Sequence, residues 1–396
     1  MSMSENVRRQ MVEGSWIRRM FEEGNALRAL HGADKVFDLS LGNPIVEPPA
    51  ELKAELLKLA EHPIPGMHRY MANAGYEETR AAVAAELERE TGVTMSFRDI
   101  VMTCGASGAM NVALKTLLNP GEEVIVLAPF FVEFLSYVDN HGGKPRIVMT
   151  GSDFLPDMEK LERAIGPQTK ALILNSPNNP TGVVYSDRVI RQLGELLARK
   201  EAEFGHQIYI ISDEPYRRIL FDGLTPVPVF QYYHNAILVT SHSKDLALPG
   251  ERIGYLALNP ESDEHDELMA GFIHSNRVLG FVNAPALMQH LVTGLQNVTV
   301  SVPEYERKRD LLYNELKGMG YDVVRPQGAF YVFPQAPVDD DVEFVRELLS
   351  LLVLVVPGRG FGWPGHFRAA YCIDNRTLEG SLDGFRKAAV RHGLTR

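Results

Sequence analysis

The sequence predicts an α/β protein in which a large unit with a mostly parallel sheet is followed by a smaller α+β unit. Two observations carry this prediction. Between residues 99 and 241, apolar runs of strand length alternate with helical segments, which is the order of βαβ units. Beyond residue 320, short strands and a helix follow in a different pattern, typical of a second core. A chain of 396 residues is also long enough for two cores.

The alternating part is built from short apolar runs and amphipathic segments. Its first helix follows Gly75, and later helices follow the strands one by one. We expect strands at 99–103, 123–127, 146–149, 171–174, 208–211 and 237–239, and helices at 77–90, 111–118, 158–165 and 187–204.

The rest of the chain divides at residues 47 and 298. Helical segments fill residues 267–317, and the last of them has the polar character of a helix between two domains, with Arg307 to Arg309 on its solvated face. We then expect strands at 321–325, 329–333, 354–356 and 367–373 and a helix at 342–352. The expected units are an N-terminal arm with part of the small domain (1–47), a large domain (48–298) and a small C-terminal domain (299–396).

Charge and composition exclude several classes of protein. The formal net charge is −11 and no strong basic patch offsets it, so no nucleic-acid partner is expected. Cys104 and Cys372 are the only cysteines, so neither a disulfide framework nor a metal site is expected. The N-terminus lacks the apolar core of a signal peptide, and no apolar run approaches about 20 residues. We expect a cytoplasmic enzyme without a membrane span.

The stretch around Lys244 carries the first chemical signal. Lys244 follows a short apolar run and precedes a turn, so its amine is expected at the end of a strand. An amine held there can condense with an aldehyde, and Ser241, Ser243 and Arg252 offer hydroxyls and a guanidinium to a phosphate monoester. These features indicate pyridoxal phosphate. On this stretch alone, a surface lysine beside a polar turn is an equal alternative.

Further candidate residues stand at other expected strand ends. The turn 105–108, with Ser107, opens a helix and presents free amides that suit a phosphate, although small residues also open helices for steric reasons. Asn179 lies in a loop at the sheet edge where ligands bind. Asp213 ends a buried strand, where a carboxylate needs a cation such as a protonated pyridine nitrogen. Arg368 needs an anion, and a salt bridge is the alternative.

Three kinds of residue carry weaker signals. Phe130, Phe131 and Phe134 follow a strand and either pack in the core or stack on a planar ring, and core packing is expected for two of them. Tyr70 lies in a loop, where most tyrosines are half-buried. Gly42 belongs to an irregular segment that either lines a site or simply connects two elements.

Four motifs follow one another in order and cover most of the chain: NSPNNPTG (175–182), SDEPY (212–216), SHSKDLALPGERIG (241–254) and FRAAY (367–371). With them the chain resembles the class I/II aminotransferases of the aspartate aminotransferase superfamily, which are pyridoxal-phosphate enzymes of fold type I. The resemblance implies a seven-stranded, mostly parallel sheet and a homodimer with shared active sites. It also implies ping-pong transfer of an amino group between an L-amino acid and a 2-oxo acid, with aspartate or glutamate as a candidate partner.

The resemblance implies roles for the residues around the ring of pyridoxal 5'-phosphate. Lys244 binds the aldehyde and later moves a proton at the substrate's α-carbon. Asp213 keeps the ring nitrogen protonated. Asn179 and Tyr216 donate to the ring oxygen, and Phe131 stacks on the ring.

It also implies a phosphate site made by Ala106, Ser107, Ser241 and Arg252, with Ser243 as a further contributor. The loop CGASGA differs from the commoner forms of this phosphate loop, which preserves the amides but removes a side-chain contact.

At the substrate end, the resemblance implies that Arg368 binds the α-carboxylate with help from Gly42. Tyr70 resembles the tyrosine that reaches the phosphate of the neighbouring subunit. A second arginine for a dicarboxylate side chain has no clear counterpart, and Arg277 and Arg69 are the candidates.

Two other functions stay open. A lyase or decarboxylase of the same fold would share the lysine, the cofactor and the first steps. A ligand-sensing regulator would need a DNA-binding domain, for which the roughly 35 residues before Asp38 are too few.

Overall fold

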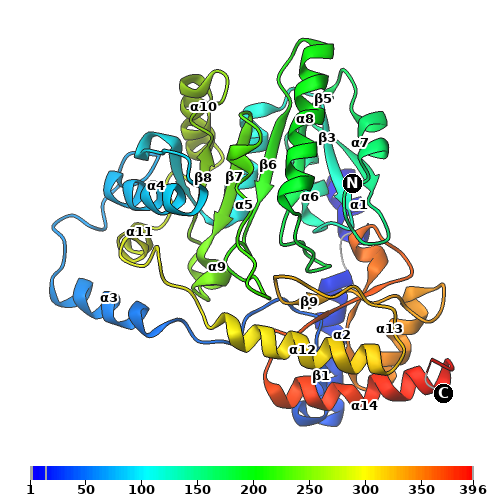
Figure 1. Cartoon of the computed structure of the whole chain (residues 1–396). Coiled ribbons are helices and arrows are strands. Elements are labelled where there is room, and N and C mark those ends of the chain that lie inside the picture. The colour runs from blue at the N-terminus through cyan, green and yellow to red at the C-terminus, as the bar shows by residue number, and fades with distance from the viewer. Residues whose placement is uncertain (1–2, 14–15, 395–396) are drawn as a thin grey trace.

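The computed structural model describes residues 3–13 and 16–394 (Figure 1). Residues 1, 2, 14 and 15 of the predicted arm lie outside the described residues. The helices are α1 (Glu5–Glu13), α2 (Trp16–His31), α3 (Ala50–Glu61), α4 (Glu77–Thr91), α5 (Gly105–Leu117), α6 (Glu133–Asn140), α7 (Met158–Ala164), α8 (Asp187–Phe204), α9 (His242–Asp245), α10 (His265–Val278), α11 (Ala286–Thr293), α12 (Val302–Gly318), α13 (Asp341–Ser350) and α14 (Asn375–Arg391). The strands are β1 (Phe37–Asp38), β2 (Ile100–Thr103), β3 (Glu123–Ala128), β4 (Lys144–Met149), β5 (Thr169–Asn175), β6 (Tyr209–Asp213), β7 (Ala236–Ser241), β8 (Gly254–Leu258), β9 (Tyr331–Val332), β10 (Val353–Leu354), β11 (Val356–Pro357) and β12 (Phe367–Ala370).

A seven-stranded sheet lies at the centre of the molecule, in the order β2-β8-β7-β6-β5-β3-β4 (Figure 1). All neighbouring strands pair in parallel except β8, which runs antiparallel to β2 and β7. The predicted α/β fold with a mostly parallel seven-stranded sheet is therefore confirmed. The strand β8 itself was missed, because its residues follow the Lys244 stretch with no helix between them.

Both faces of this sheet are buried. In β3, Val124 and Val126 pack into the core beneath α5, α6 and α10, whereas Ile125 and Leu127 pack into the core beneath α4 and α8. Side chains of successive strand residues point to opposite faces, so a continuous apolar run fits a strand that is covered twice.

The C-terminal elements form a separate small sheet. β12 lies between β11 and β9 and pairs with both in antiparallel fashion. The N-terminal strand β1 pairs in parallel with β10, with Phe37 opposite Val353. We propose on this basis that residues 1–47 belong partly with residues 299–396 in one domain, and that residues 48–298 form the other.

Two details of the predicted C-terminal region are wrong. Residues 321–325 form no strand. In α12, Lys308 and Arg309 are buried rather than solvated, with exposures of 1% and 0%. Lys308 Nζ donates to the carbonyl of Ile373 (2.7 Å), and Arg309 bonds to Asp222 and the carbonyl of Pro326 (2.9 and 2.7 Å). These partners, which are distant in sequence, make the burial possible.

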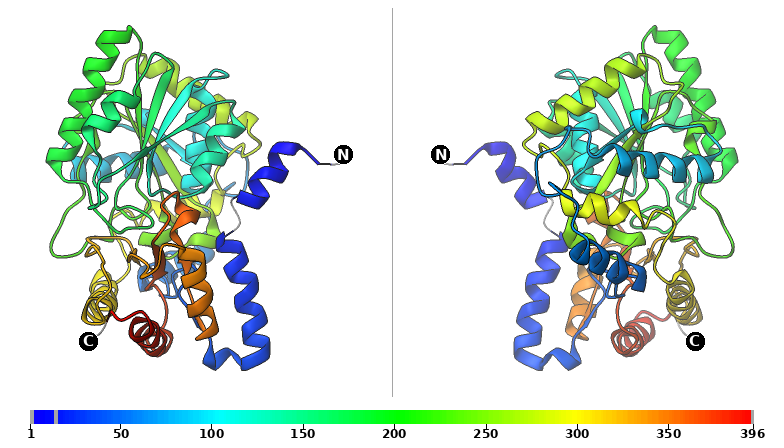
Figure 2. Two further views of the ribbon diagram at one scale, coloured as in Figure 1. Left: turned by 90° about the vertical axis from the view of Figure 1, so that its right-hand side faces the viewer. Right: turned by 90° about the vertical axis from the view of Figure 1, so that its left-hand side faces the viewer.

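The N-terminal helices lie along one side. α2 runs beside the C-terminal elements, and α1 projects outward from the body of the molecule (Figure 2). Gln10 of α1 donates to Asp139 of α6 (2.8 Å). No helix in the described part of the chain has both the length and the apolar character needed to cross a bilayer.

Candidate active site

A cavity of about 300 Å³ opens at the carboxyl ends of β5, β6 and β7. In open α/β sheets this is the edge at which ligands bind. The cavity brings together the predicted site residues from both ends of the chain: Gly42, Ala106, Ser107, Phe131, Asn179, Asp213, Tyr216, Ser241, Ser243, Lys244, Arg252 and Arg368.

Lys244 lies on the short helix α9, directly after β7, rather than on the strand itself. Its Nζ donates to the carbonyl of Gly42 (2.9 Å). Burial lowers the pKa of Lys244 to about 8, and the positive charges of Arg368 and Arg252 act in the same direction. A larger fraction of this amine is therefore neutral near physiological pH than in an ordinary lysine, which makes it a better nucleophile.

Asp213 ends β6 and is 7% exposed. Asn175, its neighbour on β5, donates to the Asp213 carboxylate and backbone carbonyl (3.1 and 3.0 Å). Burial, and secondarily the charge of Glu214, raise the pKa of Asp213 to about 8. No cationic side chain in the described part of the chain forms an ion pair with this carboxylate. The position therefore suits a cationic atom of a ligand.

Arg368 is held from several sides. It donates to Asn179 Oδ1 (3.0 Å) and to the carbonyl of Ser40 (2.6 Å). The rings of Tyr331 and Phe361 lie 4.5 and 4.7 Å from its guanidinium carbon. Its Nε is buried and has no hydrogen-bond partner. A guanidinium fixed in this way, with a donor to spare, is suited to a ligand carboxylate.

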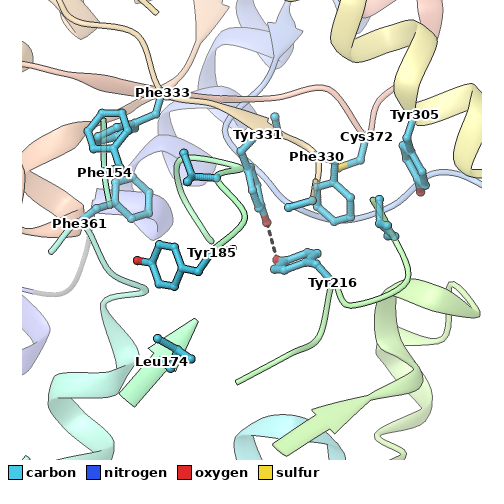
Figure 3. Packing of buried hydrophobic residues seen from close by; sticks show 14 of the residues in the cluster. Phe154, Leu174, Tyr185, Tyr216, Tyr305, Phe330, Tyr331, Phe333, Phe361 and Cys372 are labelled. Atoms are coloured by element: carbon cyan, nitrogen blue, oxygen red, sulfur yellow. Dashed lines mark hydrogen bonds between the residues drawn. The ribbon is translucent and has the colours of Figure 1, made fainter. Parts of the chain in front are cut away.

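Tyr216 and Tyr331 form a buried pair (Figure 3), and both line the cavity together with Lys244. Their hydroxyls lie 3.0 Å apart, and burial raises the pKa of Tyr331 to about 12 and that of Tyr216 well above its ordinary value. A Cβ on Gly42 would lie 1.8 Å from the Tyr331 hydroxyl. Glycine is therefore required at residue 42 for the close approach of the backbone to this pair.

The other end of the cavity suits a phosphate. Ala106 and Ser107 lie in the first turn of α5, where backbone amides have no partner within the helix. Gly105 opens that turn with φ +74°, and a Cβ there would lie 3.0 Å from Arg252 Nη2. Arg252 itself has φ +54°, a strained conformation of the kind that clusters at ligand sites.

The aromatic residues after β3 separate as expected. Phe130 is buried in the core, whereas Phe131 is half-buried and lines the cavity. Phe134 is buried and also lines the cavity, with its ring at 82° to that of Phe131.

Tyr70 does not join the cavity. Its side chain is 91% exposed and lies in a separate groove with Arg69 and Phe281. Arg277 is exposed on α10, and neither it nor Arg69 lines the cavity.

Sequence reasoning missed several residues that line the cavity: Met110, Glu133, Tyr137, Asn175, Pro215 and Tyr331. Asn175 and Pro215 stand inside two recognised motifs, so the motifs themselves could have identified them. The other four carry no local signal, because helix packing and the C-terminal sheet bring them to the cavity.

A lysine, a buried acid and an arginine with a free donor around one cavity of this fold are the arrangement expected of an enzyme that acts on amino acids, and the comparisons identify the class as the aminotransferases. The chain belongs to the aminotransferase class I and II family, whose sequence model matches residues 34–384. It is 35% identical over 360 residues to a probable aspartate/prephenate aminotransferase of Thermus aquaticus, covering 88% of this chain and 90% of that protein.

Solved structures of aminotransferases are also similar to this chain. The crystal structure of an amino transferase from Eubacterium rectale is 36% identical and covers 99% of each chain, with a TM-score of 0.96. The aspartate aminotransferase of Thermus thermophilus, solved with maleate, is 29% identical and covers 98% of this chain and all of the other, with a TM-score of 0.85. The protein is thus a transaminase, acting on amino acids and 2-oxo acids, as the sequence predicts.

Proposed function

We propose that this transaminase binds pyridoxal 5'-phosphate in the cavity and works by ping-pong chemistry on an L-amino acid and a 2-oxo acid. The observation that carries the proposal is the complementarity of the cavity lining. An amine, an unpaired buried carboxylate and the free amides of a helix end face one space. They match an aldehyde, a pyridinium nitrogen and a phosphate.

When bound, pyridoxal phosphate supplies an electron sink for the bonds at the substrate's α-carbon. Lys244 would bind the aldehyde through Nζ and, once released by the substrate amine, would carry the proton between the substrate's α-carbon and the cofactor. Asp213 holds a proton on the ring nitrogen. Ala106, Ser107, Ser241, Ser243 and Arg252 bind the phosphate.

The remaining residues orient the ring and the substrate. Phe131 stacks on the ring, and Asn179 and Tyr216 donate to its oxygen. Arg368 binds the α-carboxylate with help from Gly42. The planar fork of Arg368 fixes the rotation of the substrate about its α-carbon and therefore selects the bond that reacts.

We also propose a homodimer in the cytoplasm, with Tyr70 of each subunit completing the phosphate site of the other. The exposure of Tyr70 outside the cavity supports this proposal. So do the exposed apolar side chains at the N-terminus: Met3, just before α1, and Val7 and Met11 on α1 recur at intervals of four residues and are 43–54% exposed.

The visible absorption of the purified protein tests the function. Glutamate, aspartate, alanine and an aromatic amino acid are added one at a time. Loss of the cofactor band that a 2-oxo acid restores supports the proposal. An irreversible loss, with release of ammonia, carbon dioxide or a thiol, would instead indicate a lyase or decarboxylase of the same fold.

Replacing Arg368 by alanine should raise KM for amino acids. The expected loss is about 1.5–3 kcal/mol, roughly 10- to 150-fold in KM, because charge-assisted hydrogen bonds to the α-carboxylate disappear. Steady-state kinetics measures it. Arg386→Ala, at an exposed position paired with Glu315, is the matched control and should leave KM unchanged. An unchanged KM in Arg368→Ala would mean that the carboxylate binds elsewhere.

Capture of pyridoxal phosphate by stripped protein should depend on pH. Because the pKa of Lys244 is lowered to about 8, its neutral fraction grows about tenfold per pH unit up to pH 8 and then levels off. Asp213, with its pKa raised to about 8, becomes anionic over the same interval and acts in the same direction. The rate at which the visible band appears is measured between pH 6 and pH 10. A rate that still rises near the ordinary lysine pKa of 10.5 would contradict the lowered pKa of Lys244.

A further inference from the structure

Glu133 is the one carboxylate on the cavity lining, besides Asp213, in the described part of the chain. It is the first residue of α6, and its Oε2 is buried without a hydrogen-bond partner. Burial raises the pKa of Glu133, and the charge of Arg368 opposes that shift. A buried acceptor of this kind is costly unless a ligand supplies a donor.

Glu133 lines the same cavity as Arg368 and Tyr331. The positive charge of Arg368 acts on the pKa of Glu133, and the charge of Glu133 acts on the pKa of Tyr331. Glu133 makes no ion pair with Arg368, whose Nη atoms already bond to Asn179 and Ser40. Glu133 is therefore free to face the part of the substrate that lies beyond the α-carboxylate.

The cations of the cavity are already committed under the proposed function. Lys244 binds the aldehyde, Arg252 the phosphate and Arg368 the α-carboxylate. In the described residues no further lysine, arginine or histidine lines the cavity. Within one subunit, a second carboxylate on the substrate would therefore meet Glu133 without a cation on the cavity lining to offset the repulsion.

We propose that Glu133 determines specificity: it selects substrates whose side chain ends in a hydrogen-bond donor, such as an amide or an ammonium, over those that end in a carboxylate. The inference rests on the proposed function, because it assumes that Arg368 takes the α-carboxylate. It predicts that a substrate with a side-chain amide binds more tightly than the substrate of the same length with a side-chain carboxylate.

Binding of unreactive ligands to the holoenzyme tests the inference separately from turnover. Succinate and its monoamide, succinamate, have nearly the same shape, carry no amine and differ in one charge. Calorimetric titration of the wild type should show succinamate binding at least about tenfold more tightly, because a buried like-charge contact is expected to cost about 1.4 kcal/mol or more. Glu133→Gln should reduce this ratio to less than about threefold, mainly by improving succinate binding.

Two controls make the result specific. Glu159→Gln makes the same change of charge at a side chain that is 90% exposed, and should keep the wild-type ratio. The cofactor band and circular dichroism show whether Glu133→Gln is folded. If the variant is unfolded, the ratio of succinamate to succinate affinity in the wild type alone tests the inference.

Wild-type protein that binds succinate as tightly as succinamate would overturn the inference. So would a Glu133→Gln variant that weakens both ligands equally, since this would make Glu133 a structural counterion of Arg368. Failure of the proposed function looks different: a 2-oxo acid would not restore the cofactor band with any donor, whatever the ratio of the two ligands.

Discussion

Lys244→Ala is expected to abolish transamination, with a loss of at least roughly 10⁴-fold in kcat, because one amine both holds the aldehyde and moves the proton. Among the described residues, Lys244 is the only lysine on the cavity lining, so none can replace it. The visible band of the lysine-bound cofactor should disappear as well. Stopped-flow absorbance and single-turnover kinetics measure both effects.

The matched control is Lys317→Ala, at a side chain that is 51% exposed, and it should keep both the band and the rate. Lys244→Arg keeps the positive charge but cannot bind the aldehyde, and it should be as inactive as Lys244→Ala. Activity of either Lys244 variant near the wild-type rate would disprove the assignment of the lysine.

Asp213→Asn is expected to lower kcat by about 100- to 1000-fold, the usual effect of removing one group that stabilises charge in the transition state. Asparagine has nearly the same shape, and it can still bond to Asn175. It cannot, however, hold a proton on the ring nitrogen by charge. KM should change little, because Arg368 and not Asp213 binds the substrate carboxylate.

The readouts are kcat, KM and the position of the visible band, which should shift because the ring nitrogen is no longer charged. Asp383→Asn, at a side chain that is 71% exposed, controls for the loss of a surface carboxylate and should behave as wild type. An Asp213→Asn enzyme with normal kcat would show that the ring nitrogen has another partner.

Local sequence signals predicted most of the central sheet. Strands such as β3 and β6 are apolar runs bounded by turns, and a helix such as α8 has a clear apolar stripe, so both are decided by nearby residues. β8 was missed because it follows the Lys244 stretch without the helix that precedes most of the other strands, and it pairs antiparallel in an otherwise parallel sheet. The short strand β1 was not predicted, because it exists through its pairing with β10 and no periodicity can show within two residues.

The residues of the candidate site also fall into predictable and unpredictable groups. Lys244, Asp213 and Asn179 stand at strand ends inside dense motifs, so their convergence could be predicted. Tyr331 and Glu133 reach the cavity through tertiary packing, and nothing beside them in the sequence indicates it. The prediction that the basic run in α12 is solvated was wrong, because Lys308 and Arg309 have ion-pair partners within the fold. A charged side chain is reliably exposed only when the fold offers it no such partner.

Arg309 also limits how the protein can be dissected in the laboratory. It belongs to α12, after the proposed boundary at residue 298, yet it bonds to Asp222 and lies 4.8 Å from the ring of Phe221, both before that boundary. A truncated chain ending at residue 298 would leave Phe221 uncovered and Asp222 without this partner. Residues 48–298 are therefore a poor choice for separate expression, and chimeras with relatives should carry α12 together with the loop at residue 222.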